Sequence, residues 1–245
     1  MAIVNQQFAD GVTTITLKNP DMRNALSIEM FDAIEHSLDE LNQETHVVLL
    51  QGAGDVFCSG FDMKACANDI ELLEIFILRL SGLIKKLKRL KQPVVVSAHG
   101  AAIAGGCAML TACDFIVGSV DGKYGYPVHR LGITPAVTIP TLFQRIGEGK
   151  ARSLLMSGQI LRGRDAVGIG LLTHAAIDDE SAKELAQNIA AELAKKPPKT
   201  LQVTKQWLNE LDGSCSDELF DRVASETATV STDETQERLK SQWGS

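Results

Sequence analysis

The sequence predicts an α/β fold in which helices cover a mainly parallel sheet. Short apolar runs of strand length alternate along the chain with longer segments whose apolar residues repeat at helical spacing. Strands that are joined through helices pair in parallel, because each crossover returns the chain to the same end of the sheet. With 245 residues and 44% hydrophobic content, the chain can form one large globular domain or two small ones.

The individual elements follow from their residues. Apolar and β-branched runs predict strands at 12–17, 47–51, 93–97 and 115–118. Helical periodicity predicts a helix at 28–43, a helix pair or one long helix at 70–90, and two more helices that begin at residues 151 and 166. Ser27 suits the N-cap of the first helix, because its hydroxyl can accept a hydrogen bond from a first-turn N–H. Residues 124–145 are rich in proline, and we expect loops and turns there.

Composition and charge exclude several classes of protein. A formal net charge of -7 argues against nucleic acid or an anionic membrane as the main partner. The 5 cysteines are scattered without a Cys-x-x-Cys pair, so we expect no metal site and no disulfide framework. Charged residues interrupt the apolar segment 70–90, which argues against a membrane span. The first residues lack the basic segment of a secretory signal, and we expect a cytoplasmic protein.

Two stretches of small residues each follow an expected strand. The first glycine stretch is 56–64 (VFCSGFDMK), and the second glycine stretch is 98–108 (AHGAAIAGGCA), which runs into a helix. Small residues let a ligand approach the backbone, and the N–H groups of a helix's first turn lack intrahelical acceptors. A carbonyl oxygen that becomes an oxyanion could be held there. The second stretch alone would indicate only close packing of a helix on a sheet.

Together these stretches resemble the crotonase (enoyl-CoA hydratase/isomerase) superfamily, which writes them as F-x-x-G-x-D-[ILM]-K and H/N-G-x-x-x-G-G-G-x-x-L. The resemblance covers essentially the whole chain and implies the crotonase fold, a spiral of ββα units with parallel sheets covered by helices. It implies that the backbone N–H groups of Phe61 and Gly105 form an oxyanion hole for a thioester. Ala104 stands where the family often has a glycine. The residues expected beside the substrate in these stretches are Asp62, Met63 and Gly106.

A third segment, Arg23-Asn24-Ala25-Leu26, resembles the part of the family that holds coenzyme A. The match implies that Arg23 lies near phosphate and the backbone of Ala25 near adenine, with Leu26 beside them. A guanidinium suits phosphate because it is always charged and can donate two hydrogen bonds at once. Without the resemblance, a capped loop with a solvated arginine would explain the segment equally well. The implied ligand is an acyl-CoA or acyl-pantetheine thioester, with coenzyme A as part of the substrate and no separate cofactor.

The residues that carry hydratase chemistry are missing. Family hydratases add water with two glutamates, and the resemblance places these at Ala108 and Val128. Neither side chain can transfer a proton, so we expect poor hydration of simple enoyl-CoAs. His129 adjoins the second position, and histidine is a residue type that often transfers protons, but neighbouring residues of an extended segment point to opposite sides. A packing role therefore fits His129 better than catalysis, and Tyr124 or Tyr126 could instead donate a hydrogen bond.

Three functions remain open at this point. The first is an enolate-stabilising enzyme of the enoyl-CoA hydratase/isomerase type. Residues 132–136 (GITPA) are somewhat similar to relatives that decarboxylate glutaconyl thioesters, which suggests a decarboxylase or other enolate-forming lyase acting on a carboxyacyl-CoA or acyl-carrier-protein thioester. Loss of CO₂ needs no base and leaves an enolate that an oxyanion hole stabilises. The third is a non-catalytic acyl-thioester binding protein.

The chain breaks at Lys195-Lys196-Pro197-Pro198. We expect a core at residues 1–196 that contains the thioester site, and a C-terminal helical region at 197–245. The resemblance implies that this region packs on the core or on a neighbouring subunit. It also implies a homotrimer, or a hexamer built as a dimer of trimers.

Overall fold

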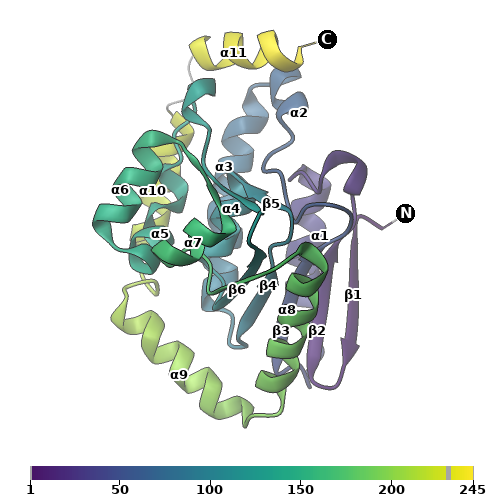
Figure 1. The fold of residues 1–245 in the computed structure, drawn as a ribbon. Helices are drawn as coiled ribbons and strands as arrows, with labels where there is room; N and C mark the ends of the chain where they lie inside the picture. The colour runs from purple at the N-terminus through teal and green to yellow at the C-terminus, as the bar shows by residue number, and fades with distance from the viewer. Residues whose placement is uncertain (1, 230–232, 245) are drawn as a thin grey trace.

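A six-stranded sheet forms the centre of the computed structural model, which describes residues 2–229 and 233–244 (Figure 1). Its strands lie in the order β1-β2-β3-β4-β6-β9. They are β1 (Val4–Ala9), β2 (Val12–Leu17), β3 (Val47–Gly52), β4 (Val94–Ser97), β6 (Phe115–Ser119) and β9 (His174–Ala176). Only the β1–β2 pair is antiparallel, and every other neighbouring pair of this sheet is parallel. The predicted parallel sheet is therefore confirmed.

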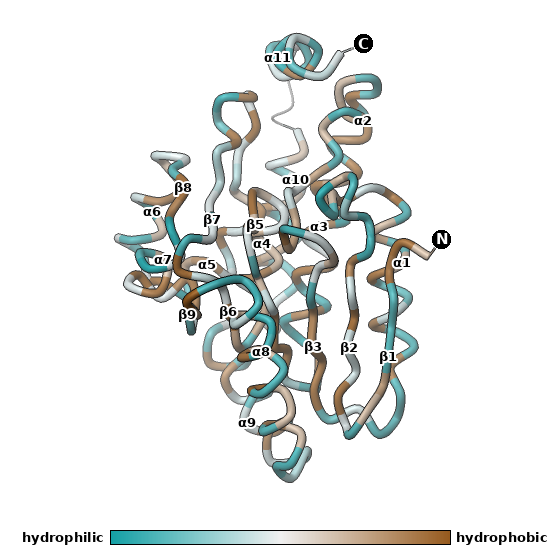
Figure 2. The backbone as a smooth tube through the Cα atoms, turned by 45° about the vertical axis from the view of Figure 1, so that its right-hand side comes forward, coloured by the Kyte–Doolittle hydropathy of each residue, from teal (hydrophilic) through white to brown (hydrophobic). Residues whose placement is uncertain are grey.

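Helices cover both faces of this sheet. One face packs against α1 (Ile28–Asp39), α3 (Glu71–Arg89) and α4 (Gly105–Thr111), and the other against α8 (Asp179–Ala194). Alternate residues of β3 point to opposite faces of the sheet. Val48 and Leu50 pack in the hydrophobic core under α1, α3 and α4, and Val47 and Leu49 pack in the core under α8. Burial on both faces explains why the run is apolar throughout, and Figure 2 shows hydrophobic residues along β3 in the middle of the sheet.

A smaller sheet lies beside the ends of these strands. It contains β5 (Ala101–Ile103), β7 (Lys123–Gly125) and β8 (Ile160–Arg162) in the order β5-β7-β8. Isolated bridges join Leu26 to Phe61 and Cys58 to Ala102. Because β3 and β4 are parallel neighbours, the chain leaves both strands at the same edge of the large sheet. The two glycine stretches follow these strands and therefore lie side by side.

The predicted helices are largely confirmed, with small differences at their ends. Ser27 caps α1 by accepting a hydrogen bond of 3.2 Å from the Met30 N–H, and α1 ends at Asp39 instead of residue 43. The segment predicted at 70–90 is one helix, α3. The remaining short helices of the core are α2 (Met63–Asn68), α5 (Ile139–Ile146), α6 (Glu148–Ser157), α7 (Gly163–Ile169) and the 3₁₀ turns η1 (Pro20–Met22), η2 (His129–Leu131) and η3 (Ala136–Thr138).

The expectation that residues 124–145 form only loops and turns is wrong. This segment contains η2, η3 and most of β7 and α5. Pro140 misled the sequence reasoning, because a proline inside a helix usually breaks it. Here the proline lies at the start of α5, where its missing N–H removes no intrahelical hydrogen bond.

The C-terminal part of the chain is helical. It contains α9 (Pro198–Leu211), α10 (Asp217–Thr229) and α11 (Asp233–Trp243). Helix α10 packs along α3, α11 lies over α2 and η2, and α9 projects away from the sheet (Figure 1). Within the described ranges, no helix combines the length and hydropathy that crossing a bilayer requires.

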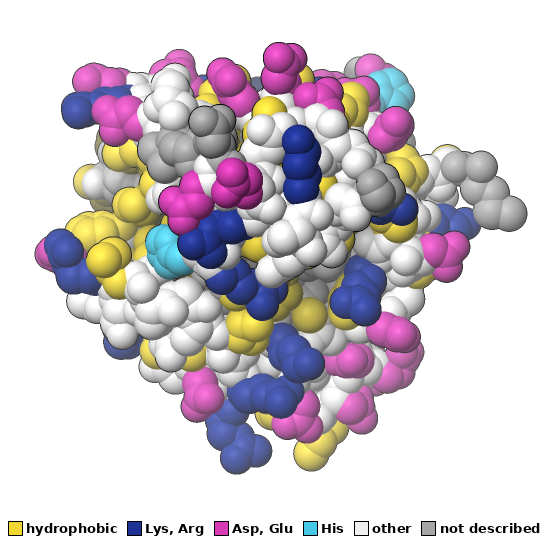
Figure 3. Space-filling model, turned by 90° about the horizontal axis from the view of Figure 1, so that it is seen from above, with side chains coloured by type: hydrophobic (Ala, Val, Ile, Leu, Met, Phe, Trp, Pro, Cys, Tyr) yellow, Lys and Arg dark blue, Asp and Glu magenta, His cyan; other side chains and the backbone are white. Residues whose placement is uncertain are grey.

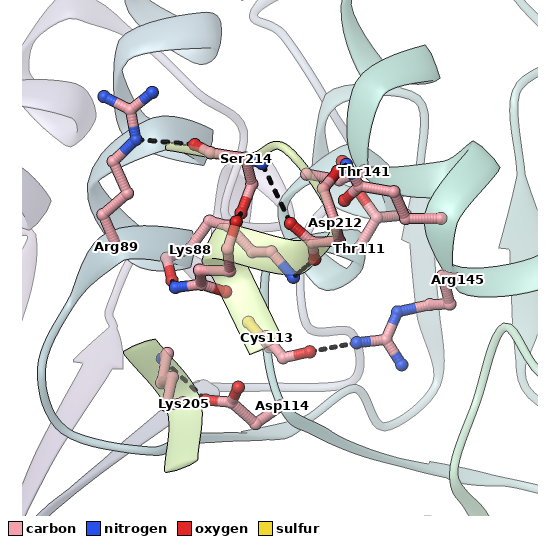
Figure 4. A network of polar contacts seen from close by, with 12 residues as sticks. Lys88, Arg89, Thr111, Cys113, Asp114, Thr141, Arg145, Lys205, Asp212 and Ser214 are labelled. Atoms are coloured by element: carbon pink, nitrogen blue, oxygen red, sulfur yellow. Dashed lines mark hydrogen bonds and ion pairs between the residues drawn. The ribbon is translucent and has the colours of Figure 1, made fainter. Parts of the chain in front are cut away.

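A buried ion pair attaches α9 to the core. The Lys205 Nζ lies 2.7 Å from a carboxylate oxygen of Asp114, and it also donates a hydrogen bond of 3.0 Å to the carbonyl of Gln92 (Figure 4). The same Asp114 oxygen accepts a hydrogen bond of 2.7 Å from the Val94 N–H. Asp114 thus joins α9 to the start of β4.

The junction between β5 and α4 contains a strained residue. Ala104 has a φ of 50° and a ψ of -113°, a conformation that favours glycine because a Cβ crowds the backbone there. Hydrogen bonds of 2.9 Å from the Ala104 N–H to the Gly125 carbonyl and from the Ala108 N–H to the Ala104 carbonyl hold it in place. The missing glycine noted in the sequence therefore has a conformational consequence.

We expect Ala104→Gly to stabilise the protein. Relief of the positive φ should raise the free energy of unfolding by about 1–2 kcal/mol. The greater conformational freedom of glycine in the unfolded chain should lower it by about 0.4–1 kcal/mol. The net gain of about 1 kcal/mol would appear as a higher midpoint in urea unfolding. The control is Ala101→Gly in β5, a residue without positive φ, which should lose about 0.5–1 kcal/mol. Equal losses in both variants would show that Ala104 is unstrained.

We expect Lys205→Ala to lower the free energy of unfolding by about 1–3 kcal/mol, because Asp114 would keep its charge without its cation. The Asp114 side chain is 27% exposed, so water offsets part of the loss. The control is Lys91→Ala, which removes an exposed lysine that has no ion pair among the described residues and should change stability by less than about 0.5 kcal/mol. Indistinguishable losses in the two variants would contradict the anchoring role of the pair.

Candidate active site

An apolar cavity of about 140 Å³ lies where the two glycine stretches meet. Its wall also includes residues of α3, of the segment from Tyr126 to Thr138, and Trp243 of α11. Among the residues that border it are five of the predicted site positions, namely Phe61, Met63, Gly105, Ala108 and Val128. The fold thus brings together positions that are far apart in the sequence.

Glycines allow the two stretches to touch. Gly60 has a φ of 96°, and a Cβ at this position would lie 3.0 Å from the carbonyl oxygen of Ile103. A Cβ on Gly106 would lie 2.6 Å from the carbonyl oxygen of Cys58, closer than real Cβ atoms approach. The backbones of the two stretches are therefore in direct contact, which no larger residue at these positions would permit.

Two backbone N–H groups at this contact lack acceptors. In the bridge between Leu26 and Phe61, the bonds run from the Leu26 N–H to the Gly60 carbonyl (2.8 Å) and from the Asp62 N–H to the Leu26 carbonyl (3.1 Å). This pattern leaves the N–H of Phe61 on the opposite side. Gly105 is the first residue of α4, so its N–H has no intrahelical acceptor. Among the described residues neither N–H donates a hydrogen bond, and both residues border the cavity.

Asp62 fixes the end of the first glycine stretch. Its carboxylate caps α2 by accepting a hydrogen bond of 3.0 Å from the Ala65 N–H. A carboxylate at a helix N-terminus is also favoured by the helix dipole. Asp62 therefore holds the backbone next to Phe61, and Met63, the first residue of α2, turns into the wall of the cavity.

The Arg23–Leu26 segment lies against the first glycine stretch. Arg23 and Asn24 both have left-handed φ angles, of 51° and 53°. The buried Asn24 amide donates hydrogen bonds of 2.9 Å to the carbonyls of Ala53 and Val56, which fixes this turn. Ala25 and Leu26 are buried, and the Arg23 side chain is exposed. Asn24 is a positioning residue that the sequence reasoning did not single out, although asparagine is among the few residues that tolerate positive φ.

The two positions of the hydratase glutamates border the cavity without supplying a proton carrier. Ala108 and Val128 are both part of its wall. The only side chains of the described lining that carry an ionisable group are Tyr126 and Arg130. The two positions where the resemblance places the hydratase glutamates therefore contribute apolar side chains to this wall.

Tyr126 belongs to a buried cluster of hydroxyl groups. Its hydroxyl lies 3.1 Å from Oγ1 of Thr138, and Thr111 and Thr141 join their hydroxyls at 2.5 Å in the same cluster. Burial raises the pKa of the Tyr126 phenol well above its ordinary value, because the phenolate would lose its hydration. Tyr126 is therefore a neutral phenol that can donate a hydrogen bond but cannot serve as a base near neutral pH.

Two other predicted donors lie elsewhere. Nε2 of His129 donates a hydrogen bond of 2.7 Å to the carbonyl of Leu155, and His129 does not border the cavity. The backbone around it forms the 3₁₀ turn η2 and is not extended. The Tyr124 hydroxyl donates to the carbonyl of Ala98 at 2.8 Å and accepts from the Ser119 N–H, so it serves packing.

The thiols near the site are not activated. Burial raises the pKa of both Cys58 and Cys107 to about 12, because no cation stabilises the thiolate. Both residues are therefore protonated near neutral pH. No group of His, Cys, Asp and Glu in the described ranges has an arrangement that would hold a metal ion.

Several residues of the wall escaped the sequence reasoning. Trp243 comes from α11, and no local pattern signals that a residue so far along the chain reaches this cavity. Thr138 also reaches the wall of the cavity through long-range packing. Arg130 had a usable signal, because it lies two residues after Val128 in a segment already assigned to the site.

Comparisons with known proteins agree with this geometry. The sequence model of the family "Enoyl-CoA hydratase/isomerase" matches residues 7–242. A Thermus thermophilus protein that is named as an enoyl-CoA hydratase is 32% identical over 208 residues, which cover 82% of each chain. A mitochondrial Delta(3,5)-Delta(2,4)-dienoyl-CoA isomerase of Dictyostelium discoideum is 26% identical over 233 residues, covering 89% of this chain and 79% of the isomerase.

The fold is also that of solved members of this family. The crystal structure of an enoyl-CoA hydratase/isomerase from Xanthobacter autotrophicus Py2 superposes with a TM-score of 0.88 at 22% identity. The match covers 99% of this chain and 94% of the other. The chain has the crotonase fold and belongs to the enoyl-CoA hydratase/isomerase family.

Proposed function

We propose that this protein binds an acyl-CoA thioester and stabilises its enolate with the N–H groups of Phe61 and Gly105. The observation that carries the proposal is that both groups lack acceptors among the described residues and border one apolar cavity. Fixed donors in a site of low polarity stabilise a developing oxyanion strongly, and losing one such donor in other enzymes costs about 10²–10³ in kcat. The two N–H groups thus provide an oxyanion hole without any side-chain chemistry.

The Arg23–Leu26 segment supports binding of the coenzyme. Leu26 pairs with Phe61, so a thioester whose carbonyl reaches Phe61 would lie beside this segment. The exposed Arg23 guanidinium has no partner among the described residues and can bind phosphate. Figure 3 looks onto the end of the molecule that carries α11, where Lys and Arg side chains gather in the middle of the face. Such a face attracts the phosphates of a coenzyme despite the negative net charge.

The size of the cavity favours a short acyl group. Its volume of about 140 Å³ is close to the roughly 150 Å³ of an engineered protein cavity that accommodates benzene. About six carbon atoms would therefore fill it. The lining is almost wholly apolar, so an aliphatic chain would be bound by removal of its surface from water.

The reaction that fits best is one in which an enolate forms without a carboxylate base. Neither Ala108 nor Val128 can move a proton, and Tyr126 is a donor only. This requirement favours a decarboxylase or other enolate-forming lyase, because the described lining contains no Asp, Glu or His. Cleavage of a carboxylate as CO₂ leaves its electron pair on the α-carbon as the enolate that the two N–H groups stabilise. Tyr126 is the one phenol of the described lining, and its hydroxyl could return a proton to the α-carbon.

We also propose that α9 joins copies of this chain into a homotrimer. Val203, Trp207 and Leu211 follow one another at intervals of four residues on α9 and are 45%, 59% and 82% exposed. A stripe of large apolar side chains on a projecting helix is unusual for a surface that faces only water. A second copy of the chain would remove this stripe from water.

We expect crotonyl-CoA to bind to the purified protein but not to be hydrated at a rate typical of a hydratase. Each acid or base that such a site lacks typically contributes about 10²–10⁴ to the rate. Binding is measured by calorimetry, and hydration by loss of the enoyl-thioester absorbance in the same sample. A family hydratase with both glutamates serves as the positive control. Rapid hydration would contradict the proposed chemistry, and failure to bind would contradict the ligand class.

A further inference from the structure

We propose that Arg130 selects acyl groups that end in a carboxylate, which rests on the proposed thioester site and narrows its substrate. Arg130 is the one formally charged side chain of the described residues that border the cavity. The rest of this wall consists of apolar side chains, backbone and uncharged hydroxyl groups. A single cation at the border of an apolar cavity is the chemistry that recognises an apolar chain with an anionic end.

The guanidinium of Arg130 is free to bind an anion. It forms no ion pair and no hydrogen bond with any described residue. Some other arginines are paired, such as Arg79 with Asp32 and Arg89 with Asp217, whereas among the described residues Arg130 differs from the equally unpaired Arg23 and Arg164 in bordering the cavity. Glu234 of α11 pairs with Arg238 at 2.7 Å and forms no ion pair with Arg130.

The backbone that carries Arg130 is nevertheless fixed. Its carbonyl accepts a hydrogen bond of 3.1 Å from Arg238, and the Gly132 carbonyl accepts one of 3.2 Å from the Thr235 hydroxyl. Helix α11 thus clamps η2 against the cavity while the Arg130 side chain stays unengaged. A fixed backbone with an unpaired guanidinium is suited to a ligand that arrives from outside the chain.

A carboxylate fits this position better than a methyl group. The planar guanidinium of the exposed Arg130 can donate two parallel hydrogen bonds to a carboxylate, whereas a methyl group offers it no acceptor. Arg130 belongs to η2 and not to either glycine stretch, so it borders the cavity from a different element than the two N–H groups. An acyl chain of about five carbons could then place its thioester at the N–H groups and its terminal carboxylate at Arg130.

The test compares the binding of two saturated thioesters of equal chain length, glutaryl-CoA and valeryl-CoA, by calorimetry. The wild-type protein should bind glutaryl-CoA about tenfold or more tightly, the range expected for a hydrogen-bonded charge pair. Arg130→Gln should remove this preference while valeryl-CoA binds as before, and Arg130→Lys should retain part of it. The matched control is Arg164→Gln on α7, which removes one exposed positive charge away from the cavity and should leave the preference intact.

The other outcomes separate the possible errors. Equal affinities in the wild type, or a preference that survives Arg130→Gln in a folded variant, would overturn the assignment. Equal weakening of both thioesters in Arg130→Gln would overturn it too, because Arg130 would then bind the phosphates of the coenzyme. If valeryl-CoA binds while glutaryl-CoA shows no advantage, only this inference fails. If neither thioester binds, the proposed function fails together with it.

Discussion

The site depends on direct backbone contact between the segments that follow β3 and β4. Parallel pairing sends both segments to the same edge of the sheet, and glycines at 60 and 106 let them touch. That contact places the N–H of Phe61 and the N–H of Gly105 beside one cavity. Asn24 and Asp62 secure it from the flanks through hydrogen bonds to backbone atoms. The proposed oxyanion hole would thus depend on the backbone of the fold, and the surrounding side chains would determine which reaction it supports.

Much of this arrangement could be predicted from the sequence, because its signals are local. The buried strands are short apolar runs, Ser27 is a capping residue, and the glycine stretches follow strands directly. The small sheet could not be predicted, because its strands have only 3 residues each and pair across long separations. Helix α5 was not predicted, because Pro140 near its start indicates a break in a helix. Trp243 reaches the cavity through tertiary packing alone. Phe61 and Gly105 could be predicted from sequence motifs, and the position of Arg130 two residues after Val128 was the only sequence signal for its place at the cavity.

Two departures from the family pattern have different physical effects. Ala104 keeps the backbone conformation that glycine would favour and carries its strain at the start of α4. Ala108 and Val128 leave the fold unstrained but remove proton transfer from the cavity. In our proposal the chain has the geometry for polarising a carbonyl but lacks the two glutamates that family hydratases are expected to use for hydration. Arg130 and the neutral Tyr126 are the remaining groups through which this wall could act on a ligand.

The central claim is that the N–H groups of Phe61 and Gly105 polarise a thioester carbonyl, and the stretching frequency of that carbonyl tests it most directly. Infrared difference spectra of butyryl-CoA with ¹³C at the carbonyl would be recorded free and bound. Our account predicts a lower frequency in the bound state than in buffer, and a smaller shift in a folded Gly105→Pro variant, which lacks one donor. A bound carbonyl whose frequency equals or exceeds that in buffer would contradict the assignment, whatever reaction the protein performs.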